Sequence, residues 1–318
     1  MRPFPKAGYE PGIREFGNGS FAWLQPDGGW GLSNSGLVTD DGEALLIDTL
    51  FDTQHTQAML DGFAKATDAK IRTIVNTHEN GDHWFGNALV DGAEIIATER
   101  AANDMREQGP ERLATMMKAA PQLGLTGEYL LHCFGRYDFE HASPRLPDTT
   151  FRGRMSRTAG SKRVDLIEVG PAHTGGDAIV HVPDDRAVFT GDILFINGHP
   201  VVWAGPIGNW IAACDMILSL NAEIIVPGHG PVTDTHGVKR VHDYLVYIRD
   251  EAKKRRDAGM GALEAARSIA LDDFAGWGDA ERIAVNVATL YREFGDTNVP
   301  ADAATLFGWM AQLWKDRK

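Results

Sequence analysis

Cysteine is almost absent from this sequence of 318 residues. Only Cys133 and Cys214 are present, so the chain can build neither a disulfide framework nor a four-thiolate zinc site. Long apolar runs are lacking too, because no stretch approaches the roughly 18 uninterrupted apolar residues of a membrane span. The first residues, MRPFPKAGYEPGIREF, have no apolar centre of the kind found in signal peptides. These absences predict a cytoplasmic protein that does not bind a membrane.

Positive charge is also scarce. The sequence has 31 Lys and Arg against 44 Asp and Glu, a formal net charge of −13. An acidic surface repels phosphate backbones and no basic patch is visible, which argues against nucleic-acid binding. With 43% hydrophobic residues the chain can still bury a sizeable core. We therefore expect an enzyme-sized globular protein whose partner is a small-molecule substrate; its oligomeric state is not indicated.

The chain divides into three parts by pattern. Residues 1–20 are rich in Gly and Pro and predict an irregular N-terminal arm. Residues 21–232 alternate short apolar strands with helices, and about 99–139 read as a helical, lid-like insert. Residues 233–318 read only as helices, which predicts a C-terminal helical region packed on the α/β part. The expected strands of the middle part lie at 21–24, 36–39, 44–48, 71–77, 94–98, 165–169, 178–182, 187–190 and 223–226.

Four of the eleven histidines share one context: each follows a short apolar strand and lies in a glycine-bearing loop. His78 and His83 lie in IVNTHENGDHWFGN, His173 in VGPAHTGGD and His229 in IIVPGHGPV. Asp192 ends its strand, AVFTGD, in the same way. Strand ends can converge at one edge of a sheet, and imidazole and carboxylate are ligands of zinc and other divalent metals. The pattern predicts a metal site.

With these motifs the sequence resembles the metallo-β-lactamase-fold superfamily, whose signature is His-x-His-x-Asp-His followed by a distant His, an Asp and a last His. The resemblance covers about residues 20–232 and implies an αββα sandwich with a C-terminal helical appendage. It implies one or two zinc ions, with iron or manganese also compatible. The first ion would be held by His78, Asn80 and His173, and the second by Asp82, His83 and His229, with Asp192 bridging both. Asp48, closing the strand ALLID, matches the aspartate that supports the metal loop.

Asn80 departs from the family pattern, because it occupies the position of the second histidine. An amide oxygen is a weaker and harder donor to zinc than an imidazole nitrogen. The second ligand set is complete, so we expect tighter binding at the second site than at the first. Two ions are favoured over one.

The implied chemistry is hydrolysis, in which a metal-bound hydroxide attacks a carbonyl-type substrate such as an ester, lactone, thioester or amide. Asp82 would orient the nucleophile, and Glu79 is expected to support neighbouring groups rather than bind metal. Aromatic side chains near the motifs could form substrate-binding walls: Trp84, Phe85, Trp203 and Trp210. The absence of an export signal argues against a secreted β-lactamase.

Three other functions stay open at this point. The chain also resembles the superfamily's polyketide-type cyclases and dehydratases, for which aromatic walls and an altered first site would be suitable. An iron-dependent thiol dioxygenase needs one metal with open positions. A metal-poor, inactive binding protein is the third alternative, although all but one of the family's ligand positions are intact.

Overall fold

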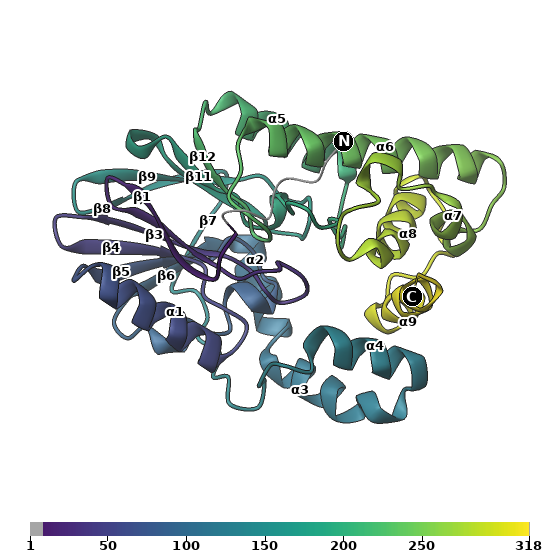
Figure 1. Ribbon diagram of the computed structural model, residues 1–318, viewed down its shortest axis with the longest axis horizontal. Helices are drawn as coiled ribbons and strands as arrows, with labels where there is room; N and C mark the ends of the chain where they lie inside the picture. Colours follow the sequence, from purple (N-terminus) through teal and green to yellow (C-terminus); the bar gives the residue numbers. More distant parts are fainter. Residues whose placement is uncertain (1–8, 318) are drawn as a thin grey trace.

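The computed structural model describes residues 9–317 and confirms the predicted fold, an αββα sandwich (Figure 1). Two sheets face each other and helices cover their outer faces. No helix among the described residues is long and apolar enough to cross a bilayer.

The first sheet has seven strands in sequence order, and its parallel half carries part of the site. The strands from β1 to β4 pair antiparallel, and those from β4 to β7 pair parallel. The bounds are β1 Gly12–Gly17, β2 Ser20–Leu24, β3 Ser35–Asp40, β4 Glu43–Ile47, β5 Lys70–Val75, β6 Glu94–Thr98 and β7 Thr149–Phe151.

The second sheet has five strands in the order β12-β11-β10-β9-β8. Only β11 and β12 are parallel; the other pairs are antiparallel. The bounds are β8 Arg154–Ala159, β9 Lys162–Glu168, β10 Ala178–Val182, β11 Ala187–Phe189 and β12 Ile224–Val226.

Apolar side chains on both inner faces hold the sandwich together. Leu45 and Ile47 of β4 pack in one core cluster with Val180 and Phe189 of the second sheet. On the other side of the first sheet, Met59 of α1 packs in a separate cluster. Strand β4 is thus buried on both faces, which explains its continuous apolar run ALLI.

Apart from α2, which directly follows β6, the helices fall into three groups, as Figure 1 shows. Helix α1 covers the first sheet, α5 and the long α6 cover the second, and the remaining C-terminal helices lie at one end of the sandwich beside α3 and α4. Tyr129 of α4 contacts the ring of Trp314 on α9 at a centroid distance of 5.6 Å. The bounds are α1 Thr53–Ala66, α2 Glu99–Glu107, α3 Pro110–Ala119, α4 Gly124–Phe134, α5 Ile207–Ser219, α6 Thr235–Asp257, α7 Ala262–Ser268, α8 Ile283–Glu293 and α9 Ala303–Asp316.

One expectation about the N-terminal arm is wrong. Residues 1–8 lie outside the described part, but Gly12–Gly17 is not irregular: it forms β1 and pairs antiparallel with β2. The glycines at the two ends of β1 have positive φ angles (106° at Gly12, 86° at Gly17). They allow the backbone to bend at the ends of the strand, so the high glycine content does not prevent the strand from forming.

Candidate metal centre

The residues predicted to hold metal come from loops at one edge of the sandwich. Strands β4 and β5 run parallel, as do β11 and β12, so the carboxyl ends within each pair lie together. Asp48 follows β4, and the segment 78–83 follows β5. Asp192 follows β11 and His229 follows β12, while His173 lies in the loop from β9 to β10.

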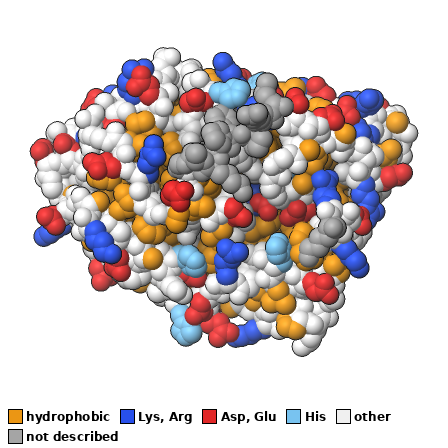
Figure 2. All heavy atoms as spheres, viewed as in Figure 1, with side chains coloured by type: hydrophobic (Ala, Val, Ile, Leu, Met, Phe, Trp, Pro, Cys, Tyr) orange, Lys and Arg blue, Asp and Glu red, His pale blue; other side chains and the backbone are white. Residues whose placement is uncertain are grey.

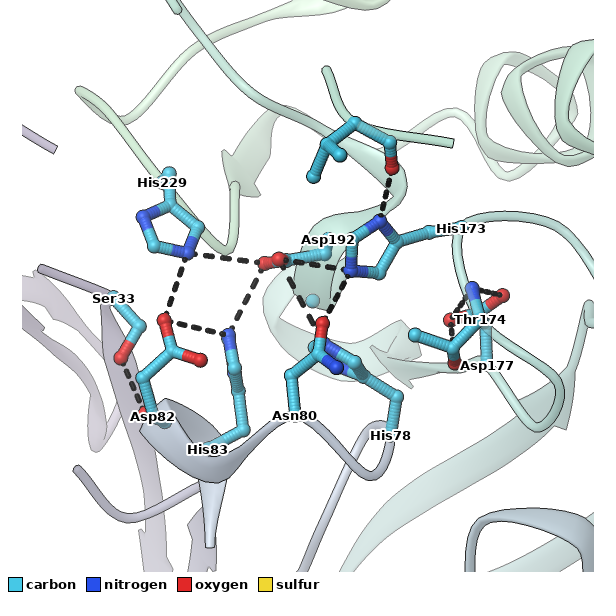
Figure 3. Close-up of polar contacts among 12 residues, drawn as sticks. Ser33, His78, Asn80, Asp82, His83, His173, Thr174, Asp177, Asp192 and His229 are labelled. Atoms are coloured by element: carbon cyan, nitrogen blue, oxygen red, sulfur yellow. Dashed lines mark hydrogen bonds and ion pairs between the residues drawn. The ribbon is translucent and has the colours of Figure 1, made fainter. Parts of the chain in front are cut away.

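Asp192 lies at the centre of this cluster, and its two oxygens face different histidines (Figure 3). Oδ1 is 3.2 Å from Nε2 of His83 and 3.5 Å from Nε2 of His229. Oδ2 is 3.3 Å from Nε2 of His173 and 3.7 Å from Nε2 of His78. The carboxylate therefore stands between two pairs of imidazoles.

Hydrogen bonds on the outer side of the rings fix the tautomers of His83 and His78. Nδ1–H of His83 donates to Oδ2 of Asp48 at 2.8 Å. Thr77 Oγ1 donates its only proton to the same Asp48 oxygen at 2.7 Å, so it must accept from Nδ1–H of His78 at 3.0 Å. In their neutral forms both rings therefore carry the proton on Nδ1 and present the Nε2 lone pair to the cluster.

Backbone carbonyls do the same for the other two rings. Nδ1–H of His173 donates to the carbonyl of Val201 at 2.7 Å, and Nδ1–H of His229 to that of Gly28 at 3.1 Å. A carbonyl oxygen can only accept, so in the neutral rings Nε2 of each again carries a lone pair.

The result is a buried group of acceptors without donors between them. Nε2 of His78, Nε2 of His83 and Oδ1 of Asp192 are buried and have no hydrogen-bond partner. Ligand atoms lie within 4.8 Å of one another in two overlapping groups, His78–His83–Asp192 and Asp82–His83–His229. A proton can join one pair of these acceptors at a time, whereas a cation can bind several of them. Converging imidazole and carboxylate lone pairs are the ligand set of divalent first-row metals. The residues therefore fit a divalent metal centre.

Electrostatics within the cluster keep Asp192 ionised. Burial alone would raise the pKa of Asp192, but positive charge at the imidazoles of His229, His83 and His78 holds it well below its ordinary value. Although burial lowers the pKa of His83, the carboxylates of Asp192, Asp82 and Asp48 together raise it well above its ordinary value, so protons supply this positive charge when no cation is bound. For Asp48, burial outweighs its hydrogen bonds and raises the pKa. The carboxylate at the centre is thus ready to bind a cation at neutral pH.

Asn80 lies beside His173. Its Oδ1 is 2.8 Å from Nε2 of His173 (Figure 3). In the tautomer of His173 that donates to Val201, Nε2 carries a lone pair, and this lone pair faces one on Oδ1 of Asn80. Two arrangements resolve this contact. In the first, a cation binds to both lone pairs. In the second, the side-chain amide is turned over so that Nδ2 donates to Nε2 of His173, and Asn80 is then not a metal ligand.

Asp82 and Glu79 occupy different environments. Oδ2 of Asp82 is 3.3 Å from Nε2 of His229, and its side chain is 11% exposed against 4% for Asp192. Glu79 is buried, and its Oε1 accepts from the amide of Gly175 at 3.4 Å. Burial raises the pKa of Glu79 to about 7. Asp82 is therefore the more open carboxylate of the cluster.

The cluster forms one wall of a cavity of about 420 Å³. Its other walls are mainly apolar, and the lid-like insert and the C-terminal helices both contribute to them. The apolar lining residues include Trp30, Phe51, Phe85, Leu113, Met116, Phe134, Phe195, Trp203 and Phe307.

Two of the four predicted wall residues do not line this cavity. Phe85 and Trp203 do. Trp84 and Trp210 are fully buried, and their indole N–H groups donate to the carbonyls of Glu79 and Ile193, both at 2.9 Å. These two side chains are core residues, so placing them in the pocket wall was wrong.

Sequence reasoning missed Trp30, Arg282 and Phe307 as cavity residues. Trp30 precedes β3, Arg282 precedes α8 and Phe307 lies on α9. The rings of Trp30 and Phe307 are 5.8 Å apart, and the Arg282 guanidinium lies 4.3 Å from the Trp30 ring. No pattern in the sequence distinguishes these residues from ordinary packing, because only the fold brings them together.

Comparison with known proteins agrees with this geometry. The sequence model of the metallo-beta-lactamase superfamily matches residues 28–229, more than half of the chain. The chain belongs to this superfamily. The matched segment begins just before β3 and ends at His229, so it contains every predicted ligand; α6 to α9 lie beyond it.

Relatives within the superfamily include hydrolases. A linear primary-alkylsulfatase of Pseudomonas sp. (strain ATCC 19151) is 23% identical over 269 residues, covering 71% of this chain and 48% of that protein. A hydroxyacylglutathione hydrolase of Brucella anthropi is 32% identical over 146 residues, covering 42% of this chain and 54% of that protein. The chain thus spans about half the length of these curated relatives.

Among solved structures, a stereoselective inverting sec-alkylsulfatase from Pseudomonas sp. is similar with a TM-score of 0.68 at 15% identity. The match covers 90% of this chain and 50% of that one. At this identity the likeness shows a shared fold.

Proposed function

We propose that this chain is a metal-dependent hydrolase of ester-type bonds in substrates with an apolar body. The observation that carries the proposal is the set of four imidazoles whose outward nitrogens each donate to a fixed acceptor while their inward lone pairs meet Asp192. The hydrolase relatives support the reaction class.

In this proposal His78, Asn80 and His173 hold one zinc ion, Asp82, His83 and His229 hold the other, and Asp192 contacts both. Bound divalent ions would supply Lewis acidity and bring the pKa of water from 15.7 towards neutrality. Asp82, the most open of these carboxylates, is positioned to orient the nucleophile and accept its proton. Asp48 and Thr77 hold the imidazoles in place by hydrogen bonds.

The rest of the cavity orients the substrate and excludes water. Phe85, Trp203 and Phe307 offer apolar surface next to the metal-binding wall, which suits an alkyl or aryl group beside the bond to be cleaved. Carboxylic esters, lactones and thioesters are the first substrates to test. Sulfate esters are the second candidate, because alkylsulfatases appear among both the sequence relatives and the structural neighbours.

The test is a matched substrate screen on zinc-loaded protein. We expect hydrolysis of p-nitrophenyl octanoate or a medium-chain lactone, loss of that activity after chelation, and its return with zinc. His83→Ala, which removes a ligand, should be inactive under all three conditions. Cleavage of octyl sulfate in preference to the octanoate would select the second candidate. Equal turnover by wild type and His83→Ala would contradict the proposal.

A further inference from the structure

Helix α8 and Arg282, the residue directly before it, carry a row of polar side chains on one face. Arg282, Asn286, Thr289 and Glu293 follow one another at intervals of four, three and four residues, so they project from the same side of the helix. The first three are fully or almost fully buried. Buried polar groups require hydrogen-bond partners, and these four side chains all bond to a single stretch of backbone.

That stretch is the segment 199–207, which follows the Asp192 loop. Arg282 Nη1 donates to the carbonyl of His199 at 3.0 Å, and Thr289 Oγ1 donates to the carbonyl of Val202 at 2.7 Å. Glu293 Oε1 accepts from the amide of Ile207 at 2.9 Å.

Asn286 holds this backbone from both of its amide atoms. Its Nδ2 donates to the carbonyl of Pro200 at 2.9 Å, and its Oδ1 accepts from the amide of Val202 at 2.8 Å. The side chain is fully buried.

The peptide unit between Val201 and Val202 connects Asn286 to the metal centre. Its N–H donates to Asn286, and its C=O accepts Nδ1–H of His173 at 2.7 Å. A trans peptide is planar, with N–H and C=O pointing in opposite directions. Fixing the N–H with Asn286 therefore also fixes the direction in which the carbonyl meets His173.

We propose that Asn286 is a positioning residue for His173, acting through the Val201–Val202 peptide to set the affinity of the first metal site. Because α8 lies outside the segment 28–229 that matches the superfamily, this support comes from the C-terminal helical region. The inference rests on the proposed metal centre. It assigns the C-terminal helices a role at the site besides their contribution to the cavity wall.

The test compares Asn286→Ala with Thr289→Val. Both variants remove buried hydrogen bonds from the same face of α8 to the same backbone segment: Asn286→Ala removes two to this segment and one to the Tyr244 hydroxyl, and Thr289→Val removes one. Thr289 binds the Val202 carbonyl, which belongs to the next peptide unit, and the N–H of that unit donates to the backbone carbonyl of His173 rather than to its ring. Zinc titration of chelator-treated protein, with competition against a chelator of known affinity, measures the two sites separately. Partners that orient a metal-binding histidine typically contribute about 10- to 100-fold to metal affinity.

We expect Asn286→Ala to weaken the first zinc by about tenfold or more and to leave the second within about twofold. Thr289→Val should leave both sites within about twofold. A general loosening of the fold would weaken both sites in both variants, and that result, or unchanged binding in Asn286→Ala, would overturn the inference. Wild type that binds no zinc would contradict the proposed function itself.

A measurement on wild type covers the case in which Asn286→Ala does not fold. Filling the first site should polarise the His173–Val201 contact and shift the amide ¹H–¹⁵N signal of Val202. The amide of Ile225, which donates to the carbonyl of Thr233, is a reference that should not move. A Val202 signal that stays unchanged through the first-site step of the titration would overturn the inference.

Discussion

Asn80 is the residue on which the two metal sites differ most. On one side of Asp192, the carboxylate of Asp82 lies with His83 and His229. On the other side, beside His78 and His173, the third residue is Asn80, whose side chain is an amide. An amide is neutral, so it contributes less to zinc binding than the carboxylate does. In the proposed centre we therefore expect the site that contains Asn80 to fill last.

Replacing Asn80 by histidine should strengthen the first site. We expect Asn80→His to tighten binding of the weaker zinc by about tenfold or more, because a third imidazole would join His78 and His173. The measurement is a zinc titration followed by dialysis, after which the variant should retain a second equivalent that wild type loses. If wild type already holds two zinc ions with equal, tight affinity, the interpretation of Asn80 is wrong.

His199 is the second residue with a measurable consequence. It is buried between the rings of Tyr244 and Trp277, and burial together with the nearby charges of Arg317 and Arg282 lowers its pKa from 6.5 to about 3. In the unfolded chain the ring takes up a proton near pH 6.5, whereas in the folded chain it stays neutral. The folded state therefore loses stability as pH falls below 6.5.

We expect this one group to reduce the free energy of unfolding by about 1.4 kcal/mol for each pH unit between 6.5 and 3. Denaturant unfolding in EDTA at pH 7.5 and 5.5, for wild type and His199→Phe, isolates the contribution, since the other histidines are common to both proteins. The variant should lose less stability between the two pH values. An identical loss in both proteins would contradict the assignment.

At the scale of elements, the strands that carry the metal loops could be predicted and most of the edge strands could not. The strands before Asp48 and Asp192 are buried on both faces and read as apolar runs, and the strand before His78 is buried in its last three residues. The missed strands, β1, β7 and β8, all lie at sheet edges. In β8, RMSRTA, exposed polar residues alternate with the half-buried Met155 and Arg157, so the sequence lacks an apolar signal.

The lid-like insert supplies the clearest prediction at this scale. Among the residues of α3 only Pro110 is buried, yet Leu113 and Met116 line the cavity. Met116→Ala should raise KM for p-nitrophenyl octanoate by about tenfold, as expected for the loss of one to two kcal/mol of apolar contact, and should leave the acetate ester unchanged. Met117→Ala is the matched control, because Met117 is equally half-buried but does not line the cavity.

Equal effects of the two methionine variants, or a change of KM for the acetate ester as large as that for the octanoate, would show that α3 does not contact the apolar group. Melting temperatures of both variants should stay close to wild type because both side chains are only half-buried.

At the scale of the whole molecule, the side chains of the candidate metal centre are hydrogen-bonded to parts of the chain that the motifs do not include. His229 is oriented by Gly28, and His173 by Val201, which α8 holds in place. The motifs alone indicated which residues converge; the acceptors that orient them are backbone atoms, and no residue type marks them in a sequence. The same reason explains why Trp30 and Phe307 could not be recognised as cavity residues.

The net charge of −13 is spread rather than concentrated on the face that Figure 2 shows, where acidic and basic side chains are interspersed. The exposed guanidinium of Arg112 and the buried one of Arg282 are the cationic groups that line the cavity among the described residues.

The central claim is that Asp192 joins two metal sites into one centre, and metal content tests it most directly. Zinc-loaded wild type, equilibrated with buffer that holds free zinc at a fixed concentration high enough to fill the weaker site, should hold two equivalents per chain by elemental analysis. Asp192→Ala, which removes the side chain that faces both pairs of imidazoles, should retain less than one equivalent while keeping the circular dichroism of the folded sheets. If Asp192→Ala binds as much zinc as wild type, or if wild type binds none, the account of a metal centre built around Asp192 is contradicted.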